Sequence, residues 1–115
     1  MTIYKPAVEK KISTIIEKLD LEPELVAPSR ALYKSASRTA GIVMSRIRDD
    51  SLVLACVYIT MRLCSKRPVN QDVFSYHFGI STATLRKTYK LVASAMDMDR
   101  QKIVSREANV GVSRS

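Results

Sequence analysis

Basic side chains gather late in the sequence, where Arg86, Lys87 and Lys90 follow one another closely. Residues 62–90 contain six Arg or Lys against a single acidic residue, a net charge of +5 in a chain whose total is +8. Residues 1–27, in contrast, carry a net charge of −1. Guanidinium groups can fork onto the O6/N7 edge of guanine, and ammonium groups bind phosphates. The distribution therefore predicts a surface that binds a polyanion.

The residues that serve as nucleophiles and metal ligands are few. His77 is the only histidine, and the two cysteines, Cys56 and Cys64, are eight residues apart with no CxxC pair. Neither a four-ligand zinc site nor a nucleophile–base–orienter set can be assembled from them. We therefore expect a protein that is not an enzyme and holds no cofactor or metal. Both thiols are predicted to be buried core residues of a reducing compartment.

Length and hydropathy predict one domain that does not enter a membrane. The 115 residues suit a single core, which we assign to residues 5–98, with a flexible tail over 99–115. The longest apolar run, Leu52–Cys64, has 13 residues and includes Arg62, whereas a membrane span needs about 20. The N-terminus lacks the apolar segment of a signal peptide. An intracellular location is expected: the nucleus in a eukaryote, the cytoplasm in an archaeon.

Apolar periodicity predicts an all-α fold of five helices. The first spans about 6–19, and the second covers 24–40 and ends at Gly41. The third follows Asp49 and Asp50, which are expected to cap it, and is apolar on nearly every side. Such a helix is buried in most directions, so the other helices should surround it.

The last two predicted helices form a helix-turn-helix. Asn70 begins a helix that ends at Phe78, with Val73 and Phe74 also on its buried face, and Gly79-Ile80-Ser81 makes the turn. Ser81 caps a final helix over 82–96. Its inward residues are Leu85, Tyr89 and Val92, and its exposed residues are Thr82, Ala83, Arg86, Lys87 and Lys90. The exposed set could enter a DNA major groove.

The order of these segments resembles the C-terminal cyclin-like repeat of transcription factor IIB and of archaeal transcription factor B. The matching residues are Leu19-Asp20-Leu21, Leu54-Ala55-Cys56-Val57-Tyr58, Asn70-Gln71, Gly79-Ile80-Ser81, Thr84-Leu85-Arg86 and Tyr89-Lys90-Leu91. The resemblance covers roughly residues 5–98 and is most specific in the last helix. It implies a five-helix cyclin-like domain whose final helix reads promoter DNA beside the TATA box.

The resemblance also implies partners and base-reading positions. The family's base-reading residues fall on Ala83 and Arg86, to which we add Thr82. Phosphate contacts are assigned to Lys66, Arg67, Gln71, Ser81, Thr84, Lys87 and Lys90. The implied partners are double-stranded promoter DNA and TATA-binding protein. The family binds RNA polymerase through a zinc ribbon that has no counterpart in this sequence, so the resemblance leaves open whether RNA polymerase is a partner.

Two other functions are compatible with the same residues. A cyclin-like domain can instead bind a protein in the grooves between its helices, in which case the basic face is incidental. A helix-turn-helix can also belong to a regulator that dimerises on a palindromic site.

Overall fold

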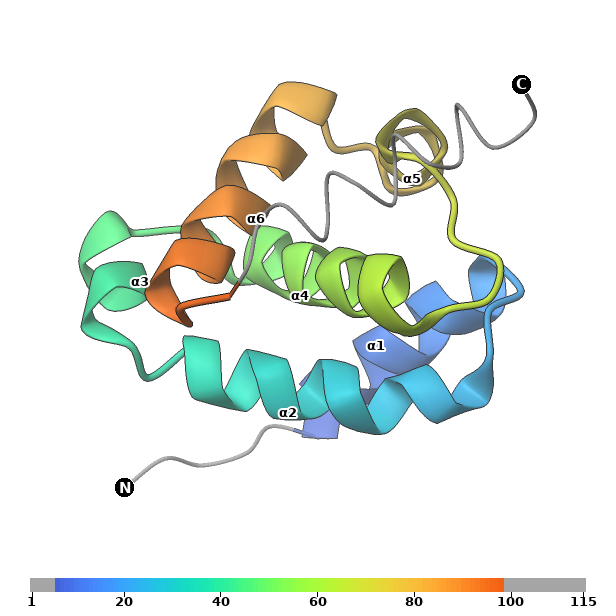
Figure 1. Cartoon of the computed structure of the whole chain (residues 1–115), viewed down its shortest axis with the longest axis horizontal. Helices are drawn as coiled ribbons and strands as arrows, with labels where there is room; N and C mark the ends of the chain where they lie inside the picture. The colour runs from blue at the N-terminus through green and yellow to red at the C-terminus, as the bar shows by residue number, and fades with distance from the viewer. Residues whose placement is uncertain (1–5, 99–115) are drawn as a thin grey trace.

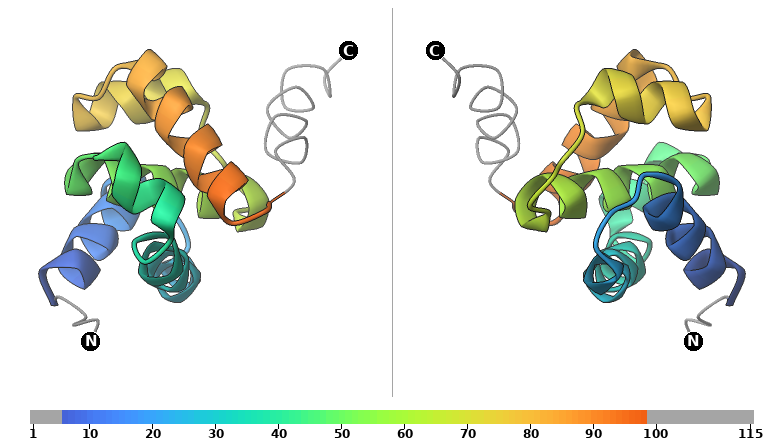
Figure 2. Two further views of the ribbon diagram at one scale, coloured as in Figure 1. Left: turned by 90° about the vertical axis from the view of Figure 1, so that its left-hand side faces the viewer. Right: turned by 90° about the vertical axis from the view of Figure 1, so that its right-hand side faces the viewer.

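The long apolar segment forms the centre of the molecule. A computed structural model of the chain describes residues 6–98, and in it this segment is α4 (Asp49–Cys64). All residues from Leu52 to Arg62 except the half-buried Leu54 are buried, so this stretch is enclosed on nearly every side. In Figure 1, α1 and α2 lie on one side of α4 and α5 and α6 on the other. The two turned views of Figure 2 show the same layers.

The first predicted helix is confirmed as α1 (Pro6–Lys18). Its stripe Val8, Ile12, Ile15 and Ile16 is buried, as the spacing predicts. The chain then turns at Asp20, whose φ of 54° lies in the left-handed region, and Leu21 returns to the core.

The second helix is shorter than predicted. A 3-10 turn, η1 (Pro23–Leu25), leads into α2 (Val26–Ala36). Pro28 is tolerated because it lies in the first turn of α2, where backbone N–H groups have no partner within the helix. The helix ends at Ala36, so the predicted extension to residue 40 and the capping role of Gly41 are both wrong.

Gly41 instead lies inside a further helix, α3 (Ala40–Ser45), which the sequence did not predict. A Cβ atom at Gly41 would lie 3.9 Å from Ala95 Cβ, so the glycine lies close to the end of α6. Arg46 ends the helix in the left-handed conformation, with φ 57°. The described residues therefore contain six α-helices rather than five, in an all-α architecture compatible with a cyclin-like domain.

The helix-turn-helix is confirmed as α5 (Gln71–Phe78) and α6 (Thr82–Ala95). Phe74 is buried and Phe78 half-buried, but Val73 is 38% exposed, which corrects its assignment to the core. Within residues 6–98, no helix combines the length and the apolar character needed to cross a membrane. The predicted tail over 99–115 lies outside the described residues.

Two further predictions about α4 are wrong. Its N-cap is Arg48 rather than an aspartate, and Asp49 and Asp50 lie in the first turn, where their charge still favours the positive end of the helix dipole. Cys64, the last residue of the helix, is exposed because it lies beyond the surrounded stretch, whereas Cys56 is fully buried.

The two thiols should therefore differ in reactivity. Burial raises the pKa of Cys56 to about 12, so almost no thiolate forms there near pH 8. With Ellman's reagent at pH 8, we expect one fast thiol per native chain and a second only on unfolding. Cys64→Ser should abolish the fast phase and Cys56→Ala should preserve it. Two fast thiols in the native protein would contradict the buried position of Cys56.

Candidate nucleic-acid interface

Local hydrogen bonds determine where both helices of the motif begin. Asn70 accepts a hydrogen bond at its Oδ1 from Val73 N (2.9 Å), and Ser81 accepts one at its Oγ from Thr84 N (3.0 Å). Between them, Gly79 adopts φ 63°, a conformation that costs glycine little. The angle between α5 and α6 thus follows from residues that the sequence identifies.

The inner face of α6 is held against α4 by buried side chains. Leu85 and Val92 are fully buried and Tyr89 is 2% exposed. The Tyr89 ring lies 5.1 Å from that of Tyr58, which meets Phe74 of α5 edge-on at 5.3 Å. Both tyrosines are core residues. The aromatic cluster ties α4, α5 and α6 together and holds α6 in one orientation.

The outer face of α6 carries the predicted base-reading residues. Ala83 and Arg86 are exposed, and Thr82 is half-buried at the first position of the helix. Lys87 and Lys90 are exposed on the same helix, which contains no acidic residue. None of the three cations on α6 has an ion-pair partner among residues 6–98. Their charge is therefore available to a ligand.

The other predicted phosphate contacts do not all join this surface. Lys66 and Arg67 lie in the loop after α4, at the opposite end of that helix from α3 (Figure 1). Arg67 Nη2 lies 3.4 Å from the Asp20 carbonyl and 4.0 Å from the Asp20 carboxylate. The predicted site is thus divided. The loop after α4 lies at one end of that helix, whereas the loop between α3 and α4, which packs beside the start of α6, lies at the other end.

Three polar side chains of the predicted site are engaged or turned inward. The Ser81 hydroxyl donates to Thr84 Oγ1 (2.9 Å), so the two groups complete the cap of α6 together. Gln71 is half-buried, and its Oε1 is buried with no hydrogen-bond partner among the described residues. Ser81 and Thr84 therefore support the start of α6 more than they extend the basic surface.

Counting charges along the sequence assigns one cation too many to the basic surface. Arg62 is fully buried, and its Nη1 donates to the Val69 carbonyl at 2.9 Å. A buried guanidinium adds little to the potential outside the protein compared with an exposed one. Arg62 therefore belongs to the structure of the loop and not to the candidate interface.

Sequence reasoning missed two arginines beside α6. Arg46 and Arg48 are exposed in the short loop between α3 and α4, and with Lys87 they line a pocket of about 270 Å³. The signal was present as the run Arg46-Ile47-Arg48, but without α3 nothing indicated that this loop returns to α6.

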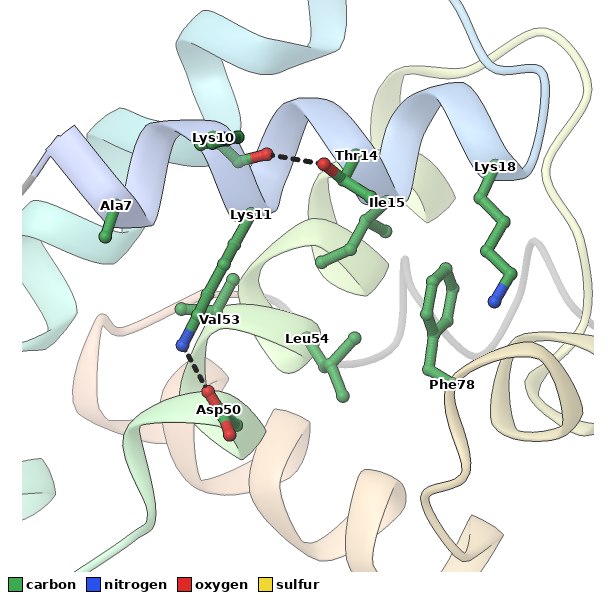
Figure 3. Close-up of a pocket in the computed structure, with 10 residues that line it drawn as sticks. All are labelled: Ala7, Lys10, Lys11, Thr14, Ile15, Lys18, Asp50, Val53, Leu54 and Phe78. Carbon is green, nitrogen blue, oxygen red and sulfur yellow. Dashed lines mark hydrogen bonds and ion pairs between the residues drawn. The ribbon is translucent and has the colours of Figure 1, made fainter.

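A second, larger cavity lies between α1 and α4. It has a volume of about 590 Å³ and an apolar floor that includes Ile15, Leu54 and Phe78 (Figure 3). Lys10, Lys11 and Lys18 also line it. Lys11 Nζ contacts the Asp50 carboxylate at 2.5 Å, and Lys18 lies over the Phe78 ring at 5.4 Å from its centroid.

Metal-ligating side chains do not cluster in this part of the chain. Within residues 6–98, no group of three His, Cys, Asp or Glu could hold a metal ion. His77 is half-buried on α5, beside Tyr76 and Phe78, and its carbonyl accepts a hydrogen bond from Lys18 Nζ (3.0 Å).

Comparison of the chain with models of known protein families finds no match, and comparison with curated proteins finds none either.

The Glu22 carboxylate holds the loop that contains Lys66, and its charge makes the stability of the protein depend on pH. Glu22 accepts hydrogen bonds from Lys66 N and from the Ser65 hydroxyl (both 2.7 Å), and these lower its pKa from 4.5 to about 2. A carboxylate whose pKa is lowered by folding stabilises the native state fully above its ordinary pKa. That stabilisation is lost as the pH falls towards 2.

We expect Glu22→Gln to unfold at lower urea concentration than the unaltered protein at pH 7. The difference should shrink between about pH 4.5 and pH 2. Glu17→Gln, an exposed carboxylate on α1, is the matched control and should change stability little. A difference between Glu22→Gln and the unaltered protein that is independent of pH would contradict the role of the Glu22 carboxylate.

Proposed function

We propose that this domain binds double-stranded DNA by inserting α6 into the major groove. The observation that carries the proposal is the contrast between the two faces of α6. One face is locked against α4 by Leu85, Tyr89 and Val92, while the other presents three cations that have no ion-pair partner among residues 6–98. A rigid helix with an unpaired basic face is what groove binding requires.

Side-chain size and position support different roles along α6. Ala83, near the N-terminus of the helix, allows close approach to base edges, and Arg86 lies one turn in, where its guanidinium can fork onto a guanine. Lys87 and Lys90, about 60° apart around the helix axis, lie on the same exposed face and suit phosphate contacts. The resemblance to transcription factor B further suggests that the DNA is a promoter and that TATA-binding protein lies beside it. In this proposal the domain is a binding module and not an enzyme.

Arg86→Ala and Lys90→Ala distinguish base reading from general attraction. On a duplex selected from a random pool, Arg86→Ala should cost about 1–3 kcal/mol and flatten discrimination at one base pair. Lys90→Ala should weaken all sequences about equally and reduce the slope of log K against log salt by about 0.9. Titrations on selected and scrambled duplexes at several salt concentrations measure both effects.

Lys10→Ala serves as the matched control, because Lys10 is exposed on α1, on the other side of α4 from α6 (Figures 1 and 2). It should leave affinity and salt slope nearly unchanged. Equal losses on selected and scrambled DNA for Arg86→Ala would remove Arg86 as a base reader. Absence of DNA binding by the unaltered protein at low salt, with and without TATA-binding protein, would refute the proposal.

The apolar cavity between α1 and α4 favours one alternative, a protein-binding module. An apolar floor lined with lysines suits an amphipathic helix that carries acidic residues. A fluorescent synthetic helix of Leu and Asp should then bind the unaltered protein and Arg86→Ala equally. Leu54→Glu, which places a carboxylate in the floor, should abolish that binding. Equal binding by Leu54→Glu would exclude the cavity as the binding site.

A further inference from the structure

Beside α6 the chain forms a small basic pocket that the helix-turn-helix motif does not include. The loop after α3 folds back so that Arg46 and Arg48 face the same cavity, of about 270 Å³, as Lys87 of α6. Four hydroxyl-bearing residues also line it: Ser45, Ser51, Thr84 and Thr88. The Ser45 and Thr88 hydroxyls already donate to the Ile42 and Thr84 carbonyls, at 2.6 and 2.7 Å. Three cations together with the hydroxyls of Ser51 and Thr84 match the chemistry of a phosphate group.

The two acidic residues that follow Arg48 have partners on α1 and α2, although the charge of Arg48 also helps to lower the pKa of Asp50. Asp49 accepts a hydrogen bond from Tyr33 of α2, and Asp50 pairs with Lys11 of α1. Neither aspartate lines the pocket. The first turn of α4 therefore carries two carboxylates without placing either of them among the pocket's cations.

The backbone around the pocket makes its basic residues converge. Arg46 has φ 57°, a conformation that costs a non-glycine residue energy and that ends α3 abruptly. The turn brings Arg48 to the N-cap position of α4. The Arg48 side chain makes no capping hydrogen bond there. Arg46 Nη and Arg48 Nη groups have no ion-pair partner among residues 6–98.

The pocket also lies on a particular flank of α6. At about 100° per residue, the lining residues Thr84, Thr88 and Leu91 fall on one side of the exposed face and Arg86 on the other. Lys87 lies between them. A helix in the major groove has a phosphate backbone along each flank, about 12 Å apart, so the pocket faces one of the two strands when Arg86 reads the bases.

We infer that this pocket, formed by Arg46, Arg48 and Lys87, binds a phosphodiester of the DNA strand that runs along the Thr84 flank of α6. The inference rests on the proposed function, since it assumes that α6 occupies the major groove. It extends the interface to the loop between α3 and α4 and gives that loop a role in orienting α6 on the duplex.

Neutral substitutions of the two arginines test the inference. Arg48→Gln removes the charge and keeps a polar side chain, and Arg46→Gly removes the charge while suiting the left-handed backbone. Each should reduce the slope of log K against log salt by about 0.9, which is about an eightfold loss of affinity near 0.1 M salt, with discrimination between sequences unchanged. Circular dichroism melting checks that each variant is folded, and Lys10→Ala, exposed on α1, is the control with an equal loss of charge and should keep the original slope.

The phosphate itself can be located by replacing single linkages of the selected duplex with neutral methylphosphonates. We expect one linkage at which the replacement weakens the unaltered protein but has no further effect on Arg48→Gln. That non-additivity identifies contact between the two groups. Additive losses at every linkage, or an unchanged salt slope in both arginine variants, would refute the assignment of the pocket as a phosphate-binding site.

The outcomes separate this inference from the function on which it rests. If the unaltered protein binds DNA and Arg86→Ala loses discrimination while both arginine variants keep the original slope, only the pocket fails. If the unaltered protein binds no duplex, the proposed function fails and the pocket with it. Binding of inorganic phosphate to the pocket by a protein that binds no duplex DNA would likewise count against a phosphodiester of DNA as the ligand.

Discussion

Burial of α4 on nearly every side is the constraint to which the other helices respond. A helix that is apolar all round gains nothing from lying on a surface, so its free energy falls only when neighbours cover each face. Here α1 and α2 cover one side, while α6, supported by α5, covers the other. Each of these helices needs only one apolar stripe, and α6 is left with an outer face on which charge costs little.

The end of α4 shows what this burial demands of polar groups. Arg62 is fully buried in the last turn, with Nη1 donating to the Val69 carbonyl and with Nε and Nη2 lacking a partner among the described residues. A buried guanidinium costs several kcal/mol unless it is compensated. The bond to Val69 connects the end of α4 to the segment just before α5, and Glu22 holds the same loop from the other side through Ser65 and Lys66.

The candidate interface depends on two parts of α4, the middle of the helix and its first turn. Tyr58 of α4 contacts Phe74 and Tyr89, so the position of α6 follows directly from the central helix. The loop between α3 and α4 joins the same surface because it leads into the first turn of α4, beside the start of α6. Basic residues from two separate segments thus meet on one side of the molecule, whereas Lys66 and Arg67 lie at the other end of α4.

The sequence by itself determined the all-α class, the central helix, and the start and end of α5 and α6. These features depend on local causes: apolar periodicity, the capping side chains of Asn70 and Ser81, and the left-handed preference of Gly79. It did not predict α3 or the end of α2, because a glycine in a short helix is tolerated only when tertiary packing supports it. Only the tertiary structure decided that Cys64 is exposed, that Arg62 is buried, and that Arg46 and Arg48 join Lys87 while Lys66 and Arg67 do not. Those outcomes depend on contacts between residues far apart in the chain, which periodicity along one helix does not encode.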